Sequence, residues 1–238
     1  MNPPLVLVPL ALEWVVIASI IAPLWYGFFT KRPRLGIASW FLLFLSSGIA
    51  LVAALFVAVW SVAYNFENLE KHSESLFLTI VYSLAPWILL AMAGVALNLI
   101  NLRVELVVQN FKQLMAVPVL PGKHLRTFQG VTVEVVEIES VFAIALNRPK
   151  KILISRGALT ELSEAEFEAV LWHEYGHLAA RHNALKRLAK MVALLAGFIR
   201  ASKVMSHEIE RLCEVAADNY AMKRVDPLVL KSARAKFQ

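Results

Sequence analysis

The chain has 238 residues, 58% of them hydrophobic, and a formal net charge of +6. This composition excludes an ordinary soluble domain. Only four of the 24 basic residues precede residue 102: Lys31, Arg32, Arg34 and Lys71. A basic region beside an apolar one suits anionic lipid headgroups. Nucleic acid is the competing partner, but no aromatic–basic interleaving or helix-turn-helix pattern supports it, so we expect a lipid bilayer and no nucleic acid.

Three long apolar segments fill the first part of the chain. They cover about residues 5–29, 35–64 and 76–100, and Glu13 is the only charged residue within them. Each exceeds the roughly 20 residues that a helix needs to cross the hydrocarbon core. We therefore predict three transmembrane helices.

The loops between these segments predict the orientation. The first loop, TKRPR, is basic, and the second, NFENLEKHSES, is mainly acidic. The positive-inside rule then places the N-terminus outside and everything after about Leu102 in the cytoplasm. We expect a multi-pass protein of the cell membrane, with a transmembrane domain over residues 1–101 and a cytoplasmic domain over residues 102–238.

The cytoplasmic part begins with a predicted helix over residues 102–117, which either lies on the bilayer surface or packs on the following domain. The runs VTVEVVEIE, VFAIAL and KILIS then read as short strands. They predict a small sheet of about three strands.

A helix from about Glu164 to Arg181 follows. Ser163 is a good N-cap, and Glu166 completes a capping box. Within the helix, His173 and His177 are four residues apart, so both imidazoles project from one face and can converge on one metal ion. Glu174 is rotated by about 100° from His173, where it can reach a metal-bound water without being a ligand.

A second acidic pair lies downstream, in SHEIERLCEVAADNYAM. Glu214 can supply a third ligand, and Asp218, one turn on, can accept the N–H of a ligand histidine and fix its tautomer. A structural zinc site closes four positions, whereas three ligands plus a glutamate base favour an open catalytic site. Between the two metal helices, residues 191–199 either dip into the membrane interface or form a buried core hairpin.

The stretch from Ser140 to Met222 resembles the membrane zinc metallopeptidases of the BlaR/MecR antirepressor type and, more distantly, HtpX and the CAAX prenyl proteases. The resemblance implies a gluzincin-type endopeptidase with Glu174 as general base and a segment around Phe142 to Leu146 as the edge strand that pairs with substrate. The residues implied in metal and substrate binding are His173, His177 and Glu214 as zinc ligands, Asp218 as the partner of a ligand, and Phe142, Ala143, Ile144 and Ala145 at the substrate strand. His182 departs from the pattern, since many relatives have aspartate there, which puts an expected helix-end salt bridge in doubt.

Together these features predict an α-helical membrane protein with an α+β zincin-like cytoplasmic domain. The expected reaction is zinc-dependent hydrolysis of protein substrates at the cytoplasmic face, with a regulator or repressor as one candidate substrate. His207, Arg211 and Tyr220 are candidates for stabilising the oxyanion. Two alternatives stay open: a non-proteolytic signalling or scaffold protein with a structural or silent zinc site, and a small transporter that depends on Glu13. Oligomeric state is left open.

Overall fold

The computed structural model describes residues 3–68, 88, 92, 95, 122–196 and 200–237. The chain divides into two compact units, which are described separately. The first holds Met1–Tyr26, Ala38–Lys112 and Val192–Met205, and the second holds Gly27–Ile37, Gln113–Met191 and Ser206–Gln238. The predicted helix over 102–117 lies outside the described residues, as does nearly all of the predicted span over 76–100.

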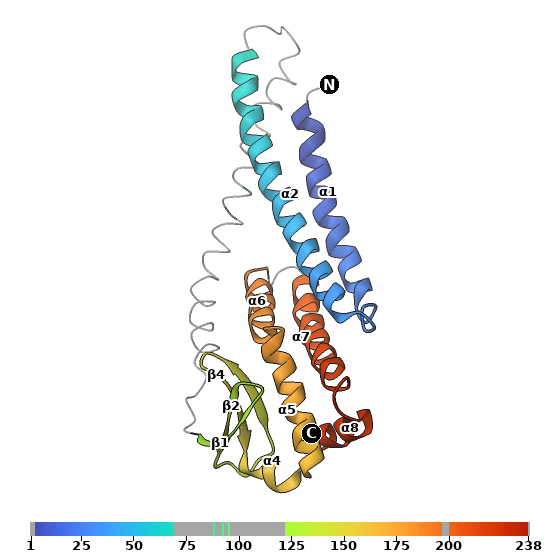
Figure 1. Ribbon diagram of the computed structural model, residues 1–238. Helices are drawn as coiled ribbons and strands as arrows, with labels where there is room; N and C mark the ends of the chain where they lie inside the picture. The colour runs from blue at the N-terminus through green and yellow to red at the C-terminus, as the bar shows by residue number, and fades with distance from the viewer. Residues whose placement is uncertain are drawn as a thin grey trace. The chain divides into compact units, whose positions relative to one another are not determined.

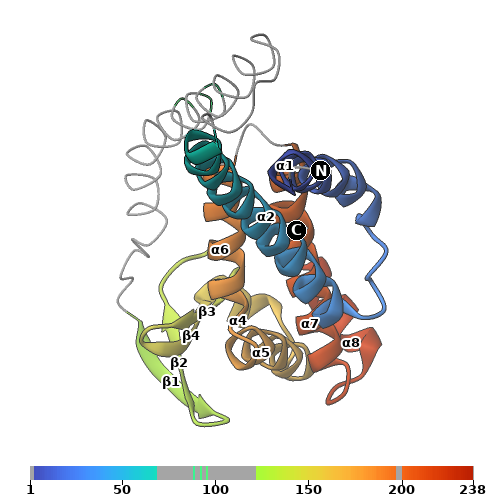
Figure 2. The same cartoon turned by 90° about the horizontal axis from the view of Figure 1, so that it is seen from above.

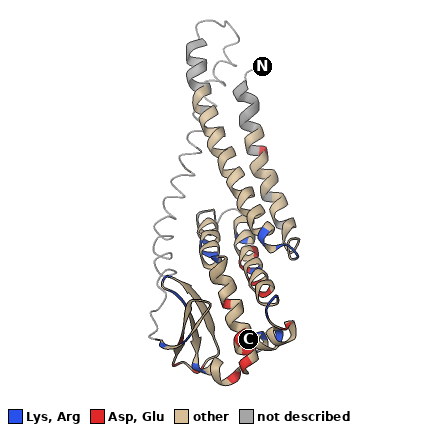
Figure 3. Cartoon of the chain, viewed as in Figure 1, with Lys and Arg blue, Asp and Glu red and all other residues tan. Residues whose placement is uncertain are grey.

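The N-terminal helices are rich in apolar residues, and their described residues include few charges, as Figure 3 shows. α1 covers Pro3–Ile21, the short 3-10 helix η1 covers Ala22–Trp25, and α2 covers Pro33–Asn68. The first predicted segment therefore stops being α-helical at Ile21, before a turn in which Gly27 takes a positive φ of 78°.

One helix in the described ranges is long and apolar enough to cross a membrane, over Pro33–Val57 within α2. Its side chains Leu42, Ile49 and Phe56, spaced by seven residues, are mostly exposed. A membrane-spanning helix would place such a face against lipid. The predicted set of three transmembrane helices is thus not confirmed, and this one helix is a weak indication of a membrane location.

The second unit contains a four-stranded mixed sheet. Its strands are β1 (Lys123–Phe128), β2 (Val131–Val136), β3 (Ala143–Asn147) and β4 (Lys150–Ser155), in the order β1-β2-β4-β3. β2 and β4 are parallel, and the other two pairs are antiparallel. The small sheet is confirmed, but β1 is one strand more than the sequence predicts, because KHLRTF has no apolar alternation.

Five helices complete the described fold: α4 (Arg156–Glu161), α5 (Glu164–Ala179), α6 (His182–Leu195), α7 (Arg200–Ala221) and α8 (Pro227–Ala235). In the second unit, α5 lies between the sheet and α8 and packs on both (Figures 1 and 2). Its apolar face, including Phe167 and Leu171, joins Val133, Ile152 and Ile154 of the sheet in one buried core. This core fixes α5 relative to the edge strand β3.

Candidate metal centre

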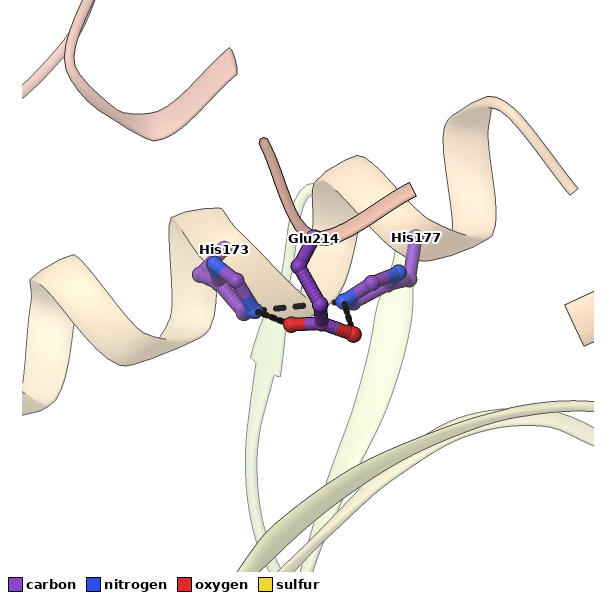
Figure 4. A group of neighbouring side chains, drawn as sticks. All are labelled: His173, His177 and Glu214. Carbon is purple, nitrogen blue, oxygen red and sulfur yellow. Dashed lines mark hydrogen bonds and ion pairs between the residues drawn. The ribbon is translucent and has the colours of Figure 1, made fainter. Parts of the chain in front are cut away.

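α5 begins where the sequence predicts, and this start determines which face of the helix carries the histidines. The Ser163 side chain accepts the backbone N–H of Glu166, and the Glu166 side chain accepts the backbone N–H of Ser163, so the capping box is present. One face of the helix then carries His173 and His177, whose Nε2 atoms lie 3.1 Å apart. Figure 4 shows both rings turned toward the same point.

α7 brings a carboxylate to this point. Glu214 Oε2 lies 3.4 Å from His173 Nε2, and Glu214 Oε1 lies 3.6 Å from His177 Nε2 (Figure 4). A tetrahedral zinc ion with bonds of about 2.0–2.1 Å has ligand atoms about 3.3–3.4 Å apart. The three distances between ligand atoms, 3.1, 3.4 and 3.6 Å, bracket this value, so the residues present fit a zinc ion. The structure therefore brings together the three residues that the sequence predicts as ligands.

The close approach of α5 and α7 depends on Gly176. A Cβ atom at this position would lie 3.2 Å from Tyr220 Cβ and 3.3 Å from Ala217 Cα. These distances are shorter than ordinary van der Waals contacts of about 3.5–4.0 Å. The room that Gly176 leaves is thus filled by α7, the helix that carries Glu214.

Asp218 lies behind His173, at the ring nitrogen that faces away from Glu214. Its Oδ1 atom lies 2.9 Å from His173 Nδ1. Both atoms are buried, and neither has another hydrogen-bond partner in the described part of the chain. The other carboxylate oxygen of Asp218 pairs with Arg234. This arrangement holds the His173 proton on Nδ1 and leaves Nε2 for a metal.

His182 takes the corresponding place behind His177, which the sequence did not predict. The two Nδ1 atoms lie 3.0 Å apart, and His182 is only 2% exposed. When Nε2 of a neutral His177 binds a metal, its proton sits on Nδ1, and His182 must accept it through an unprotonated Nδ1. The only feature of the sequence that pointed to a special role for His182 is that many relatives have aspartate at this position.

The charges around the site are strongly coupled. Burial disfavours the charged form of His173, but hydrogen bonds to Asp218 and Glu214 outweigh it and raise the pKa of His173 to about 9. Burial also opposes the charge on Glu214, yet hydrogen bonds from His173, His177 and Lys186 hold the pKa of Glu214 below its usual range. Burial, with the charges of His177 and Lys186, lowers the pKa of His182 to about 4. Metal binding at neutral pH would therefore displace a proton from His173.

Lys186 is a second residue that sequence reasoning missed. Its Nζ atom donates to Glu214 Oε1 at 2.7 Å from α6. The lysine neutralises the carboxylate and limits its rotation. No motif spacing in the sequence points to this residue.

Glu174 opens onto a cavity of about 240 Å³ beside the ligand atoms. His173 and Glu214 line the same cavity, as do Arg234 and Phe237 near the C-terminal end of the described chain. Glu174 is 9% exposed, so its carboxylate meets this space rather than bulk solvent. The cavity provides room for a reacting group next to the predicted base.

The three candidates for oxyanion stabilisation are not gathered around this cavity. Arg211 donates two hydrogen bonds to Glu208, at 2.7 and 2.8 Å. Tyr220 packs against Trp172 and Tyr175 and lines a different cavity. His207 lies at an exposed position of α7. Arg234 is the cation that does line the cavity.

The predicted substrate strand lies at an edge of the sheet, since β3 pairs only with β4 in the described part of the chain. Phe142 precedes β3, and its carbonyl accepts the N–H of Ser155 at 3.0 Å. Alternate residues of an antiparallel pair point their backbone groups away from the partner. The backbone N–H and C=O groups of Ala143 and Ala145 therefore face the open side of the sheet, whereas those of Ile144 face β4. On that open side, Asn183 Nδ2 donates to the Ala145 carbonyl at 2.7 Å.

The comparison with known proteins supports a metallopeptidase. No curated protein matches the chain. The profile of Peptidase family M48 matches residues 101–206, a range that contains the helix with His173, Glu174 and His177 and ends before Glu214. The predicted resemblance to a zinc-metallopeptidase family is confirmed by this match: residues 101–206, less than half of the chain, are similar to peptidase family M48.

Proposed function

We propose that the chain is a membrane-bound zinc endopeptidase that cuts protein substrates at the cytoplasmic face. The observation that carries the proposal is the meeting of three ligand atoms, from His173, His177 and Glu214, beside a cavity that Glu174 lines. Three protein ligands with an adjoining space are typical of a catalytic site, whereas a structural site uses four.

Each residue then has a defined role. His173, His177 and Glu214 hold the metal. When bound, zinc supplies Lewis acidity and a water of lowered pKa. Glu174 accepts the proton of the attacking water and returns it to the leaving amine. Asp218 and His182 keep the ring protons on Nδ1, so that both Nε2 atoms face the metal.

The edge strand β3 supports an extended peptide as substrate. The outward backbone groups of Ala143 suit pairing with one more strand, which is how sheet edges bind peptides. The neighbouring Ala145 carbonyl already accepts a hydrogen bond from the Asn183 side chain. A substrate strand would therefore pair at Ala143 and meet the Asn183 side chain beyond it.

The membrane part of the proposal is supported by α2. The candidate span starts at Pro33, directly after the basic residues Lys31 and Arg32. By the positive-inside rule this end of the helix faces the cytoplasm. Reporter fusions to the loop at Lys31 and to the C-terminus test the orientation, and an external C-terminus would overturn it.

The decisive experiment compares Glu174→Gln with the parent, both purified as full chains in mild detergent. We expect equal zinc content and a loss of proteolysis by about 10²–10⁴-fold, the usual contribution of a general base. Glu164→Gln, at an exposed position of the same helix, is the matched control and keeps full activity. Identical fragments from parent and Glu174→Gln would refute the mechanism and favour a silent or structural site.

A further inference from the structure

A second cavity, of about 280 Å³, lies away from the metal centre between the start of α2 and the C-terminal half of α7. Three basic side chains line it, those of Arg32, Arg34 and Lys223, together with the polar side chains of Asn219 and Tyr220. Among the described residues, no carboxylate contributes to its lining. The cavity therefore offers cations and hydrogen-bond donors to a ligand.

The charge in this cavity is not neutralised by neighbours. None of the three basic side chains forms an ion pair with a carboxylate in the described ranges. Elsewhere in the same unit such pairs are common, for example between Lys186 and Glu214 or Arg211 and Glu208. Three like charges around one small space repel one another unless an anion joins them.

The cavity wall is held in place before any ligand binds. Glu208 is fully buried on α7, and its Oε1 atom accepts the backbone N–H of Gly27 at 3.0 Å. Arg211 bonds both to Glu208 and, at 3.3 Å, to Thr30. At Gly36 a Cβ would lie 2.8 Å from Leu212 Cδ1, so the start of α2 touches α7 directly. Residues 27–36 are thus fixed against α7, and the arginines project from a rigid support.

The backbone at this point favours an anion as well. Pro33 is the first residue of α2 and has no N–H, and the Gly36 N–H bonds to the Arg32 carbonyl. The N–H groups of Arg34 and Leu35 come before that first intrahelical bond and have no helical acceptor. They stand at the positive end of a 36-residue helix, where phosphates are commonly bound. Guanidinium groups match phosphate oxygens in paired hydrogen bonds.

We propose that this cavity binds a phosphate group and that an anionic lipid headgroup supplies it. The candidate membrane span begins at Pro33, in the cavity wall itself. Phe28 and Leu35, which flank the basic residues, expose 79% and 54% of their surface. Apolar side chains beside a phosphate site suit acyl chains next to a headgroup. The choice of lipid rests on the membrane location proposed above, whereas the phosphate site itself does not.

The test uses the purified full chain in neutral detergent, titrated with dihexanoyl phosphatidylglycerol, dihexanoyl phosphatidylcholine and inorganic phosphate, with phosphorus NMR as the readout. Arg32→Gln/Arg34→Gln/Lys223→Gln removes the site. Its matched control, which removes the same charge at exposed positions elsewhere, is Lys123→Gln/Arg148→Gln/Lys231→Gln. We expect phosphatidylglycerol to bind the parent and the control at least about tenfold more tightly than the triple cavity variant. Arg34→Glu alone is the second variant, in case the triple variant does not fold.

The outcomes separate the sources of the phosphate. Weak phosphate binding with tight phosphatidylglycerol binding supports the lipid site, whereas inorganic phosphate that binds as tightly as the lipid overturns the lipid source and keeps the phosphate site. Equal binding by cavity and control variants, or equal binding of phosphatidylglycerol and phosphatidylcholine, overturns the proposal. Zinc content and proteolysis of the same preparations are measured in parallel, so failure of the protease assignment is seen separately.

Discussion

Gly176 sets the separation of the two helices that carry the metal ligands, and Gly176→Ala tests whether this separation matters. The added methyl group would lie 3.2 Å from Tyr220 Cβ and 3.3 Å from Ala217 Cα. Both neighbours lie on the rigid body of α7, so the helix itself must move away by a few tenths of an ångström. Glu214 moves with it, while His173 and His177 stay on α5.

The expected effect on stability is small because two terms oppose each other. Alanine is favoured over glycine inside a helix by about 0.8–1.0 kcal/mol. Overpacking of a tight contact costs about 1–3 kcal/mol. The net loss of unfolding free energy is therefore about 0–2 kcal/mol.

The expected effect on zinc affinity is larger. The distances from Glu214 to the two imidazoles, 3.4 and 3.6 Å, already lie at or above the tetrahedral value of about 3.3–3.4 Å. A further few tenths exceeds the tolerance of about 0.2 Å for metal–ligand distances. We expect zinc to bind about 10–100-fold more weakly, which is the range seen when the support of a ligand is removed.

The assay is competition with a chromogenic zinc chelator, run beside thermal unfolding of the metal-free protein. Gly48→Ala is the control, since no atom of the described residues lies within 4 Å of its added Cβ, and it should leave zinc affinity unchanged. If Gly176→Ala binds zinc as the parent does while its unfolding temperature rises, the close contact of α5 and α7 does not set the ligand geometry.

Three further predictions concern the surroundings of the site. Asp218→Asn should weaken zinc binding by about 10–100-fold in the same competition assay, because the amide no longer holds the His173 proton with a charged acceptor; unchanged affinity would show that the 2.9 Å contact is incidental. His182→Ala should weaken zinc binding by about tenfold, and His182→Gln, which keeps a hydrogen-bond acceptor, should recover part of the loss, whereas equal losses would point to packing alone. Glu166→Gln should lower the unfolding temperature at pH 7, since hydrogen bonds from Lys236 and Ser232, both 2.6 Å long, lose their charge. Those bonds, with the Ser163 cap, lower the pKa of Glu166 from 4.5 to about 2. The stabilisation is therefore present above about pH 4.5, and the difference in unfolding temperature between parent and variant should vanish as the pH falls toward 2. A constant difference across that range would contradict the assignment.

The parts of the fold that the sequence predicted are those set by local rules. The capping box at Ser163 and Glu166 fixed where α5 begins, and its observed end at Ala179 is two residues short of the predicted one. Helical spacing then placed His173 and His177 on one face. Glu214 was predicted from its spacing of four residues to Asp218. In the structure the two carboxylates contact opposite nitrogens of His173, Glu214 at Nε2 and Asp218 at Nδ1.

His182 could not be predicted from helical spacing. On a continuous helix, a residue five positions after His177 would be rotated by about 140° away from it. In the structure α5 ends, Arg181 takes a positive φ of 53°, and α6 starts at His182 itself. This break returns the His182 ring to the outer nitrogen of His177, and it also brings Lys186 to Glu214.

The composition of the chain limited how well β1 and the membrane spans could be predicted. KHLRTF pairs with β2 through its backbone, with a register shift between His124 and Arg126, and its side chains give no alternating signal. The long apolar segments predicted spans from length and hydropathy alone. Such a criterion finds α2, but it cannot predict that the first segment leaves the α-helix at Ile21.

α7 links the metal centre to the proposed phosphate site. Glu214 and Asp218 face α5, while Asn219 and Tyr220 line the basic cavity at the start of α2. Tyr220 belongs to both environments, because its Cβ is also the atom nearest to the space left by Gly176. Glu214 and Tyr220, six residues apart on α7, thus place a metal ligand and part of the lining of the basic cavity on one helix.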